Sequence, residues 1–464
     1  MAEDNAMLWG GRFAGGPSDE MLRLTASIGV DLALLECDAR ATKAHARVLV
    51  AAGLLEPDAL VRIDDALDAL VEEWRAGGLA PVPSDEDVHS LIERELTERL
   101  GEVGARIHAG RSRNDLVAQD LRLWCRDAAG ELLDEVSRLV DVIAARAEEH
   151  AGTVMPGLTH LQPAQPVTVG FHLLAHGFAL ARDRVRLEAA RAAADVGVLG
   201  AGALAGTTLP LDATIGARAL GCDKVFDNAM DAVSDRDFAC DLVYATAMLG
   251  VHLSRLAEEI VMWTSPLWGF ARLPEAWSTG SSMMPQKRNP DMAELVRGRA
   301  AAPVGELSSL LILIKGLPLA YARDLQEDKS LVFRAVERAR GCVRGTTAMV
   351  SGLSLDEDKL GDAAELGSSW ATDVAELLVS RGVAFRSAHE VAGRLVAKVE
   401  SSGGVVTEKL LGDHHDLLRP DDLAKLAPGA SVAARSSHGG PAAERLLEQL
   451  HDLRAYNLVR NERP

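Results

Sequence analysis

Hydrophobic residues recur at helical spacing along much of the chain. Leu132, Val136, Leu139 and Ile143 are separated by four, three and four positions, and charged residues lie between them. The same spacing recurs within residues 249–260. A period near 3.6 residues is typical of an amphipathic helix, so the pattern predicts a long helix at each of these places.

Two further segments predict a bundle of helices. Residues 242–251 are apolar almost all round, which is typical of a helix buried on every side. Another helical segment runs from Asp291 to Ile314, and Pro303 should kink or divide it, because proline cannot donate the helical hydrogen bond. No comparable run of alternating residues predicts strands. The chain is therefore predicted to be all-α, with long helices in a bundle that other subunits could complete.

Two interruptions of the apolar pattern suggest domain boundaries. They lie near residues 101–112 and 352–366, and the length of 464 residues is typical of roughly three domains. We therefore expect an N-terminal helical domain at 1–111, a central helical bundle at 112–361 and a C-terminal helical domain at 362–464.

Composition and charge narrow the class of protein. Aromatic residues make up only 4%, which favours helices over a β-sandwich. The net charge of −19 disfavours nucleic-acid and anionic-membrane partners, so an anionic ligand would require a locally cationic site. The acidic N-terminus has no apolar signal core, and the five scattered cysteines are typical of reduced thiols. We expect a cytoplasmic protein.

Several familiar kinds of site are disfavoured by the sequence. His172 and His176 are spaced as in a zinc-binding helix, but the glutamate of the H-E-x-x-H motif is absent, so we expect helix-surface or core histidines and no metal. The glycines of residues 197–206 do not fit a nucleotide-binding pattern and instead favour a tight turn packed against helices. No G-x-S-x-G nucleophile motif occurs. A zinc site, a nucleotide-binding loop and a hydrolase triad are therefore all disfavoured.

Four polar segments carry the remaining candidate chemistry. Residues 110–120 bring arginines, Ser112 and Asn114, which suit a carboxylate but also suit a helix N-terminus. Residues 157–168 hold His160 in a proline-rich turn, where a histidine serves either proton transfer or structure. Residues 280–290, GSSMMPQKRNP, bring hydroxyls, cations and an amide in a loop that is otherwise an ordinary surface segment. Residues 315–329 hold Tyr321, Gln326 and Lys329, the last two one helical turn apart.

Taken together and in this order, these segments resemble a known family. SRND, THLQ-x-AQP and GSS-x-MPQK-x-NP are similar to the three signature regions of the fumarase/aspartase superfamily. Gln286 in MPQK, LWGGRF near the start, GLPLAYARDLQEDK and RSSHGGPA resemble its argininosuccinate lyase family. The resemblance spans Leu8 to about residue 445, and its departures, at Pro163, Met283 and Arg288, remove no expected catalytic group.

The resemblance implies a fold, an assembly and a reaction. It implies three all-α domains whose long central helices join those of three partners in a homotetramer, with the three signatures meeting from three different subunits. It implies the reversible, cofactor-free elimination of argininosuccinate to arginine and fumarate, a step of arginine biosynthesis. Other possibilities are adenylosuccinate lyase, which Gln286 and the RDLQEDK segment disfavour, an inactive crystallin-like protein, and a scaffold that binds arginine or fumarate without turnover.

The same resemblance implies residue roles. Ser281 is the favoured base and His160 the favoured acid, although the reverse assignment stays open. Lys287 is expected to stabilise the carbanion, and Glu294 to orient His160. The loop of residues 280–290 is expected to close over substrate. The implied substrate-binding residues are Ser27, Ser112, Arg113, Asn114, Thr159, Asn289, Tyr321, Gln326 and Lys329. Asp31 is expected near Ser27, and His89 is expected in a supporting rather than a catalytic position.

Overall fold

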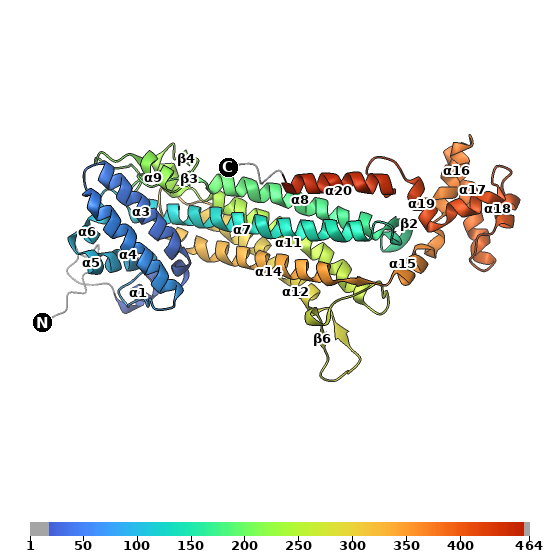
Figure 1. Cartoon of the computed structure of the whole chain (residues 1–464), viewed down its shortest axis with the longest axis horizontal. Helices are drawn as coiled ribbons and strands as arrows, with labels where there is room; N and C mark the ends of the chain where they lie inside the picture. The colour runs from blue at the N-terminus through green and yellow to red at the C-terminus, as the bar shows by residue number, and fades with distance from the viewer. Residues whose placement is uncertain (1–17, 459–464) are drawn as a thin grey trace. The chain divides into compact units, whose positions relative to one another are not determined.

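The protein is built almost entirely from helices, as the sequence predicts. A computed structural model describes residues 18–458, and the LWGGRF motif that begins at Leu8 lies outside them. The longest helices are α7 (Arg113–Glu149), α8 (Val169–Ala194), α11 (Asp237–Thr264) and α14 (Asp328–Gly352) (Figure 1). Both segments with the repeated four-three-four spacing lie within them, in α7 and α11.

Shorter helices make up most of the remaining chain. Those before α7 are α1 (Asp19–Thr25), α2 (Ile28–Asp31), α3 (Leu35–Ala51), α4 (Pro57–Arg75), α5 (Val88–Leu100) and α6 (Glu102–Ala105). Those between α8 and α14 are α9 (Ala213–Ala219), α10 (Ala229–Ser234), α12 (Asp291–Arg299) and α13 (Ala301–Ile314). The last are α15 (Glu357–Ala364), α16 (Ala371–Ser380), α17 (Phe385–Ser401), α18 (Glu408–His414), α19 (Pro428–Ala434) and α20 (Ala443–Leu458).

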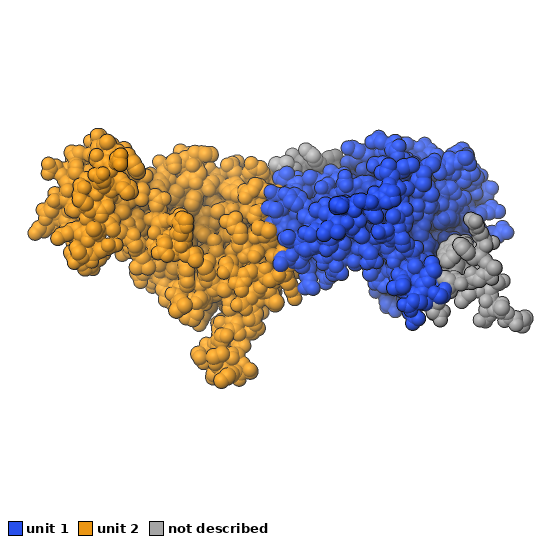
Figure 2. Space-filling view, turned by 180° about the vertical axis from the view of Figure 1, so that it is seen from behind, with its two compact units in different colours: residues 1–133, 185–248, 301–339 blue, residues 134–184, 249–300, 340–464 orange. Residues whose placement is uncertain are grey.

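The chain divides into two compact units, which Figure 2 shows in different colours. Unit 1 comprises residues 1–133, 185–248 and 301–339, and unit 2 comprises residues 134–184, 249–300 and 340–464. Apolar side chains of α3, α4 and α5, including Leu49, Ile63 and Leu91, form a core in unit 1. Those of α16 and α17, including Leu378 and Leu395, form a core in unit 2. The three domains expected from the sequence stay a prediction.

Proline does not divide the predicted helix where the sequence suggested. The break between α12 and α13 falls at Ala300, and Pro303 lies in the first turn of α13. The first-turn N–H groups of a helix have no intrahelical acceptor, so proline costs little there. The sequence predicted that the helix from Asp291 to Ile314 would be either kinked or divided. It is divided into two helices, but the boundary lies three residues before the proline.

The apolar part of α11 is only partly covered within the described chain. Leu242, Val243 and Leu249 are fully buried, but Tyr244 is 46% exposed and Val251 is 41% exposed. The prediction that residues 242–251 are buried on every side is thus wrong for these two side chains in the single chain. Their exposure leaves an apolar surface that a partner subunit could cover.

The strands of the described residues form four short two-stranded ladders, and two of them carry predicted catalytic segments. The hairpin of β1 (Val154–Thr159) and β2 (Gln162–Thr168) has His160 at its tip. The ladder of β6 (Thr279–Gly280) and β7 (Arg288–Asn289) closes the serine loop. The others pair β3 (Val196–Gly197) with β4 (Lys224–Val225), and β5 (Ala271–Arg272) with β8 (Ser354–Leu355).

Two further expectations concern the thiols and the membrane. All five cysteines are free, and three of them are buried. Among the described helices, none combines the length and the apolar character that crossing a bilayer requires.

Candidate active site

Polar residues from distant parts of the sequence meet around Glu86 in unit 1. The backbone N–H of Ser27 donates to the Glu86 carbonyl over 2.8 Å, and the Ser27 hydroxyl donates to the Asp31 carboxylate. A guanidinium nitrogen of Arg113 lies 3.0 Å from a carboxylate oxygen of Asp87 and 3.4 Å from one of Glu86. The start of α7 and the segment before α2 therefore both contact Glu86, the first through its carboxylate and the second through its backbone carbonyl.

The RDLQEDK segment joins this cluster through its 3₁₀-helix, η5 (Arg323–Glu327). Arg323 donates to the Thr25 carbonyl over 2.9 Å and pairs with the Glu86 carboxylate. Gln326 donates to the same Thr25 carbonyl over 3.2 Å. These contacts bring Gln326 close to the chain that carries Ser27. Sequence reasoning missed Glu86 and Arg323, although both lie beside predicted motif residues.

Lys329 is held by a buried ion-pair network. Its ammonium nitrogen lies 2.9 Å from a carboxylate oxygen of Asp328, and the other Asp328 oxygen accepts from Arg236 over 2.6 Å. Burial raises the pKa of Asp328, but the charges of Lys329 and Arg236 outweigh it, so the pKa of the carboxyl is lowered. Burial raises the pKa of Asp31 and of Tyr321, and the charge of Lys329 opposes both rises. The three residues therefore interact electrostatically.

His89 lies in a second buried cluster of unit 1. Its Nδ1 is 2.6 Å from an Asp38 carboxylate oxygen and 3.4 Å from one of Asp120. Neither carboxylate oxygen of the buried Asp120 has a hydrogen-bond partner in the described chain. Burial, followed by the charge of Asp38, raises the pKa of Asp120 well above its ordinary value. A histidine packed this tightly is suited to support the site rather than to transfer protons.

The SRND motif caps α7 and organises the neighbouring glycine turn. Ser112 Oγ accepts the backbone N–H of Asn114 over 3.2 Å, so the helix-cap interpretation is correct for this serine. Asp115 accepts the backbone N–H groups of Gly200 and Gly202 over 3.0 and 2.8 Å. Both glycines have positive φ, which confirms the predicted tight turn.

The Asn114 amide crosses to the same turn and donates to the Ala203 carbonyl over 3.1 Å. The turn therefore positions the amide that the family resemblance assigns to substrate. Asp115 is the group that holds the turn in place, and sequence reasoning missed it. The available signal was its place in the sequence, because Asp115 is the last residue of the SRND motif.

In unit 2, Thr159 and His160 lie at the exposed tip of the β1–β2 hairpin. His160 and Leu161 have φ values of 56° and 58°, the left-handed values of a two-residue type I′ turn. Left-handed backbone at a residue other than glycine is strained, and such strain is concentrated at functional sites. The side chains of Thr159 and His160 make no hydrogen bond or ion pair within the described chain, so the tip is available to a ligand or to another subunit.

The serine loop projects its predicted catalytic groups from the β6–β7 ladder. Ser281 Oγ accepts the backbone N–H groups of Met283 and Met284 over 3.3 and 3.0 Å. Lys287 is exposed, and the Asn289 amide donates to Thr279 over 3.4 Å. Two amide dipoles aimed at one hydroxyl oxygen favour its anionic form. The loop therefore has part of what a serine base requires.

Glu294 lies on α12 and is exposed. Within the described residues it makes no hydrogen bond or ion pair with His160. The predicted residues thus fall into two groups, one in each unit. Unit 1 holds Ser27, Ser112, Arg113, Asn114, Tyr321, Gln326 and Lys329, and unit 2 holds Thr159, His160, Ser281, Lys287, Asn289 and Glu294.

Comparison with known families agrees with this fold. A family model described as lyase matches residues 11–305. A second model, described as argininosuccinate lyase C-terminal, matches residues 368–433. Among solved structures, EDDS lyase in complex with formate has a TM-score of 0.81 and 26% identity, over 96% of this chain and 90% of that chain. A class II fumarase from Schistosoma mansoni, at 16% identity and a TM-score of 0.76, covers 90% of this chain and 93% of its own and shares the fold.

Curated relatives narrow the class further. The argininosuccinate lyase of Frankia casuarinae is 48% identical over 92% of this chain and 93% of the relative. Those of Leifsonia xyli subsp. xyli and Hyphomonas neptunium are 47% and 46% identical, over 93% and 94% of this chain and 92% and 95% of the relatives. The chain belongs to the argininosuccinate lyase family.

Proposed function

We propose that the protein catalyses the reversible elimination of argininosuccinate to arginine and fumarate, as a cytoplasmic enzyme of arginine biosynthesis. The observation that carries this assignment is the 48% identity to a curated argininosuccinate lyase over nearly the full length of both chains. The chain retains each polar group that the reaction requires, from the SRND segment to the serine loop. The reaction is a carbon–nitrogen bond cleavage by acid and base, and uses no cofactor or metal.

In this mechanism Ser281 removes a proton from the carbon beside a substrate carboxylate. That proton is weakly acidic, and a serine can accept it only as an alkoxide. The amides of Met283 and Met284 donate to Ser281 Oγ and favour the alkoxide. Lys287 follows in the same loop and adds positive charge. These contacts support Ser281 as the base, in preference to the reverse assignment with His160.

The negative charge that forms on the carboxylate is met by Lys287 and Asn289. His160, or a water molecule that it orients, protonates the departing guanidino nitrogen. Glu294 orients His160 once the assembled site brings the two together. Each proton thus has a donor and an acceptor, and the preorganised loop supplies the charge that stabilises the intermediate.

Substrate binding falls mainly to the cluster in unit 1. Ser112, Arg113 and Asn114, joined by Thr159, hold the succinate portion, because a guanidinium and neutral donors suit carboxylates. Tyr321, Gln326 and Lys329 hold the arginine portion, and Ser27 lies on the segment that Gln326 contacts through Thr25. Asp87 and Glu86 position Arg113 for this role through their ion pairs with it.

We propose that the site is completed in a homotetramer, with each of the three signatures supplied by a different subunit. Apolar side chains that a single chain leaves exposed on α11, α12 and α13 support such an assembly; they are Tyr244, Val251, Leu295, Val304, Leu311 and Ile312. Exposed apolar surface of this kind is typical of a subunit interface. The unpartnered tip at His160 agrees with a site that needs another subunit.

The activity itself is tested with purified protein and argininosuccinate. Fumarate is followed by its ultraviolet absorbance, with adenylosuccinate as the parallel substrate. We expect fumarate from argininosuccinate alone. Fumarate from adenylosuccinate would favour that lyase instead, and no fumarate from either substrate would favour a crystallin-like protein or a scaffold.

A shared site predicts that two inactive variants restore activity when their subunits mix. Coexpression of Arg113→Ala with Ser281→Ala is expected to restore activity. In the mixed tetramers some sites draw Arg113 from a Ser281→Ala subunit and Ser281 from an Arg113→Ala subunit, and these sites carry neither substitution. Random mixing leaves about a quarter of the sites intact. The measurement is the rate of fumarate formation by the hybrid tetramers, compared with each variant alone.

The matched control coexpresses Ser281→Ala with Lys287→Ala. Both residues lie in one loop and so enter each site from one subunit, which leaves no hybrid site intact. Activity restored in this control, or absent from the Arg113 and Ser281 hybrids, contradicts the shared site.

A further inference from the structure

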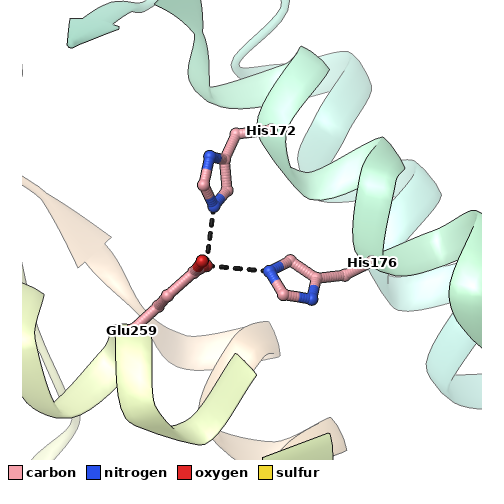
Figure 3. Close-up of side chains that lie close together, drawn as sticks. All are labelled: His172, His176 and Glu259. Carbon is pink, nitrogen blue, oxygen red and sulfur yellow. Dashed lines mark hydrogen bonds and ion pairs between the residues drawn. The ribbon is translucent and has the colours of Figure 1, made fainter. Parts of the chain in front are cut away.

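Two histidines of α8 and one glutamate of α11 converge in unit 2. His172 and His176 lie one helical turn apart and point their Nε2 atoms at the same oxygen of Glu259 (Figure 3). The distances from that oxygen, Oε2, are 2.6 Å to His172 and 2.8 Å to His176. None of these three residues has a role in the proposed elimination, so the convergence is unexplained by it.

The cluster is neither fully buried nor a loose surface group. The side chain of His176 is 13% exposed, and those of His172 and Glu259 are each 27% exposed. The Trp263 ring meets the His172 ring edge-on, with centroids 5.2 Å apart, and the two histidine rings are 5.6 Å apart. The helix and these ring contacts fix the direction of both imidazoles, while solvent still reaches the three polar groups.

The donor set is one that binds first-row transition metals. Two imidazole nitrogens and one carboxylate oxygen suit zinc, cobalt or nickel, whereas calcium and magnesium prefer oxygen ligands alone. The three ligand atoms lie within 4.8 Å of one another. Bonds of about 2.1 Å in a tetrahedral site separate ligand atoms by about 3.4 Å, so Glu259 has to retreat by about 0.7 Å. Metal binding would require this movement of Glu259 through rotation about its side-chain bonds.

We propose that His172, His176 and Glu259 bind one divalent transition-metal ion, such as Zn²⁺ or Co²⁺, with the remaining coordination position open to water. The ion would tie α8 to α11 within unit 2. Sequence reasoning looked for the third ligand between the two histidines, as in H-E-x-x-H, and rejected the site because it was absent. The fold supplies that ligand from residue 259, a separation of 83 residues from His176.

The alternative is a metal-free triad in which both imidazoles donate to one carboxylate. The two arrangements differ in what they do when a metal is offered. In the triad the Nε2 atoms carry the protons, and metal binding has to displace those protons before the nitrogens can act as ligands. A direct measurement of metal uptake therefore separates the two.

The experiment titrates Co²⁺ into the purified full-length protein in its natural assembly and follows the visible absorbance of the coordinated ion. We expect saturation at one ion per chain. His172→Ala should weaken binding at least about tenfold, since even the partners that orient metal ligands contribute 10–100-fold. Glu259→Gln serves as a second variant of nearly unchanged shape, and should weaken binding similarly.

The matched control is the double variant His414→Ala/His415→Ala, which removes two adjacent histidines at the end of α18. Its Co²⁺ affinity is expected to equal that of the unaltered protein. Circular dichroism and lyase activity verify that each variant folds, and Zn²⁺ should raise the thermal unfolding midpoint only where the three ligands are intact. Absence of stoichiometric Co²⁺ uptake, or unchanged affinity in both His172→Ala and Glu259→Gln, overturns the proposal.

Discussion

Replacing Ser281 by alanine is expected to lower kcat for argininosuccinate by roughly a thousandfold. General acid–base groups contribute about 10²–10⁴-fold to a rate, and in the proposed mechanism this serine also carries the stabilised negative charge. Alanine leaves the amides of Met283 and Met284 without the acceptor that now binds both of them. The measurement is steady-state fumarate formation by Ser281→Ala and by the unaltered enzyme.

The neighbouring Ser282 supplies the matched control. It is an exposed serine of the same loop, and within the described residues its hydroxyl accepts no backbone N–H of the loop, unlike that of Ser281. We expect Ser282→Ala to change kcat far less than Ser281→Ala, while KM in Ser281→Ala stays close to its normal value because the unit 1 cluster still binds substrate. Equal losses in the two variants would show that the loop needs both hydroxyls for its shape, and would remove Ser281 from the role of base.

Much of this architecture is predictable because it depends on local periodicity. The spacing of Leu132 and its successors predicts α7, and the same spacing predicts α11. The motifs are equally local, so Ser112, His160 and Ser281 can be named from the sequence alone. The class of fold and the reaction follow from these elements together with the family resemblance.

The contacts that position those motifs are not predictable in the same way. Glu86, two residues before α5, meets Arg323 of η5 only in the folded chain, because the two residues are 237 positions apart in sequence. Glu259 approaches His176 from a different helix, so a search for a nearby third ligand fails. The helix boundary at Ala300 likewise does not coincide with the nearby proline. Long-range contacts leave no periodic signal, and this is why the sequence predicts candidate catalytic groups but does not predict the neighbours that position them.

The largest effect on stability is expected from Asp328, which forms the centre of a buried ion-pair network. Asp328 is fully buried, and its neighbours Arg236 and Lys329 are each 2% exposed. Asp328→Ala removes the carboxylate that pairs with both of these buried cations. Removing one partner of a buried pair typically costs about 3–5 kcal/mol of unfolding free energy. We expect a loss of that size, measured by urea unfolding.

The pH dependence of stability, together with a control substitution at the nearby Asp324, distinguishes the effect of this ion-pair network from that of ordinary packing. Because the pKa of Asp328 in the folded protein is lowered from its ordinary value of 3.8, its stabilising contribution is present above that value and is lost as the pH falls through the lowered pKa. The difference in unfolding free energy between Asp328→Ala and the unaltered protein should therefore become smaller in strong acid. Asp324 is an exposed aspartate four positions earlier. The unfolding free energy of Asp324→Ala should stay within about 0.5 kcal/mol of that of the unaltered protein at any pH. If both variants lost the same unfolding free energy, or if the loss in Asp328→Ala stayed unchanged in acid, the charge of Asp328 would not stabilise the fold. Lys329 would then need another partner to position it for substrate.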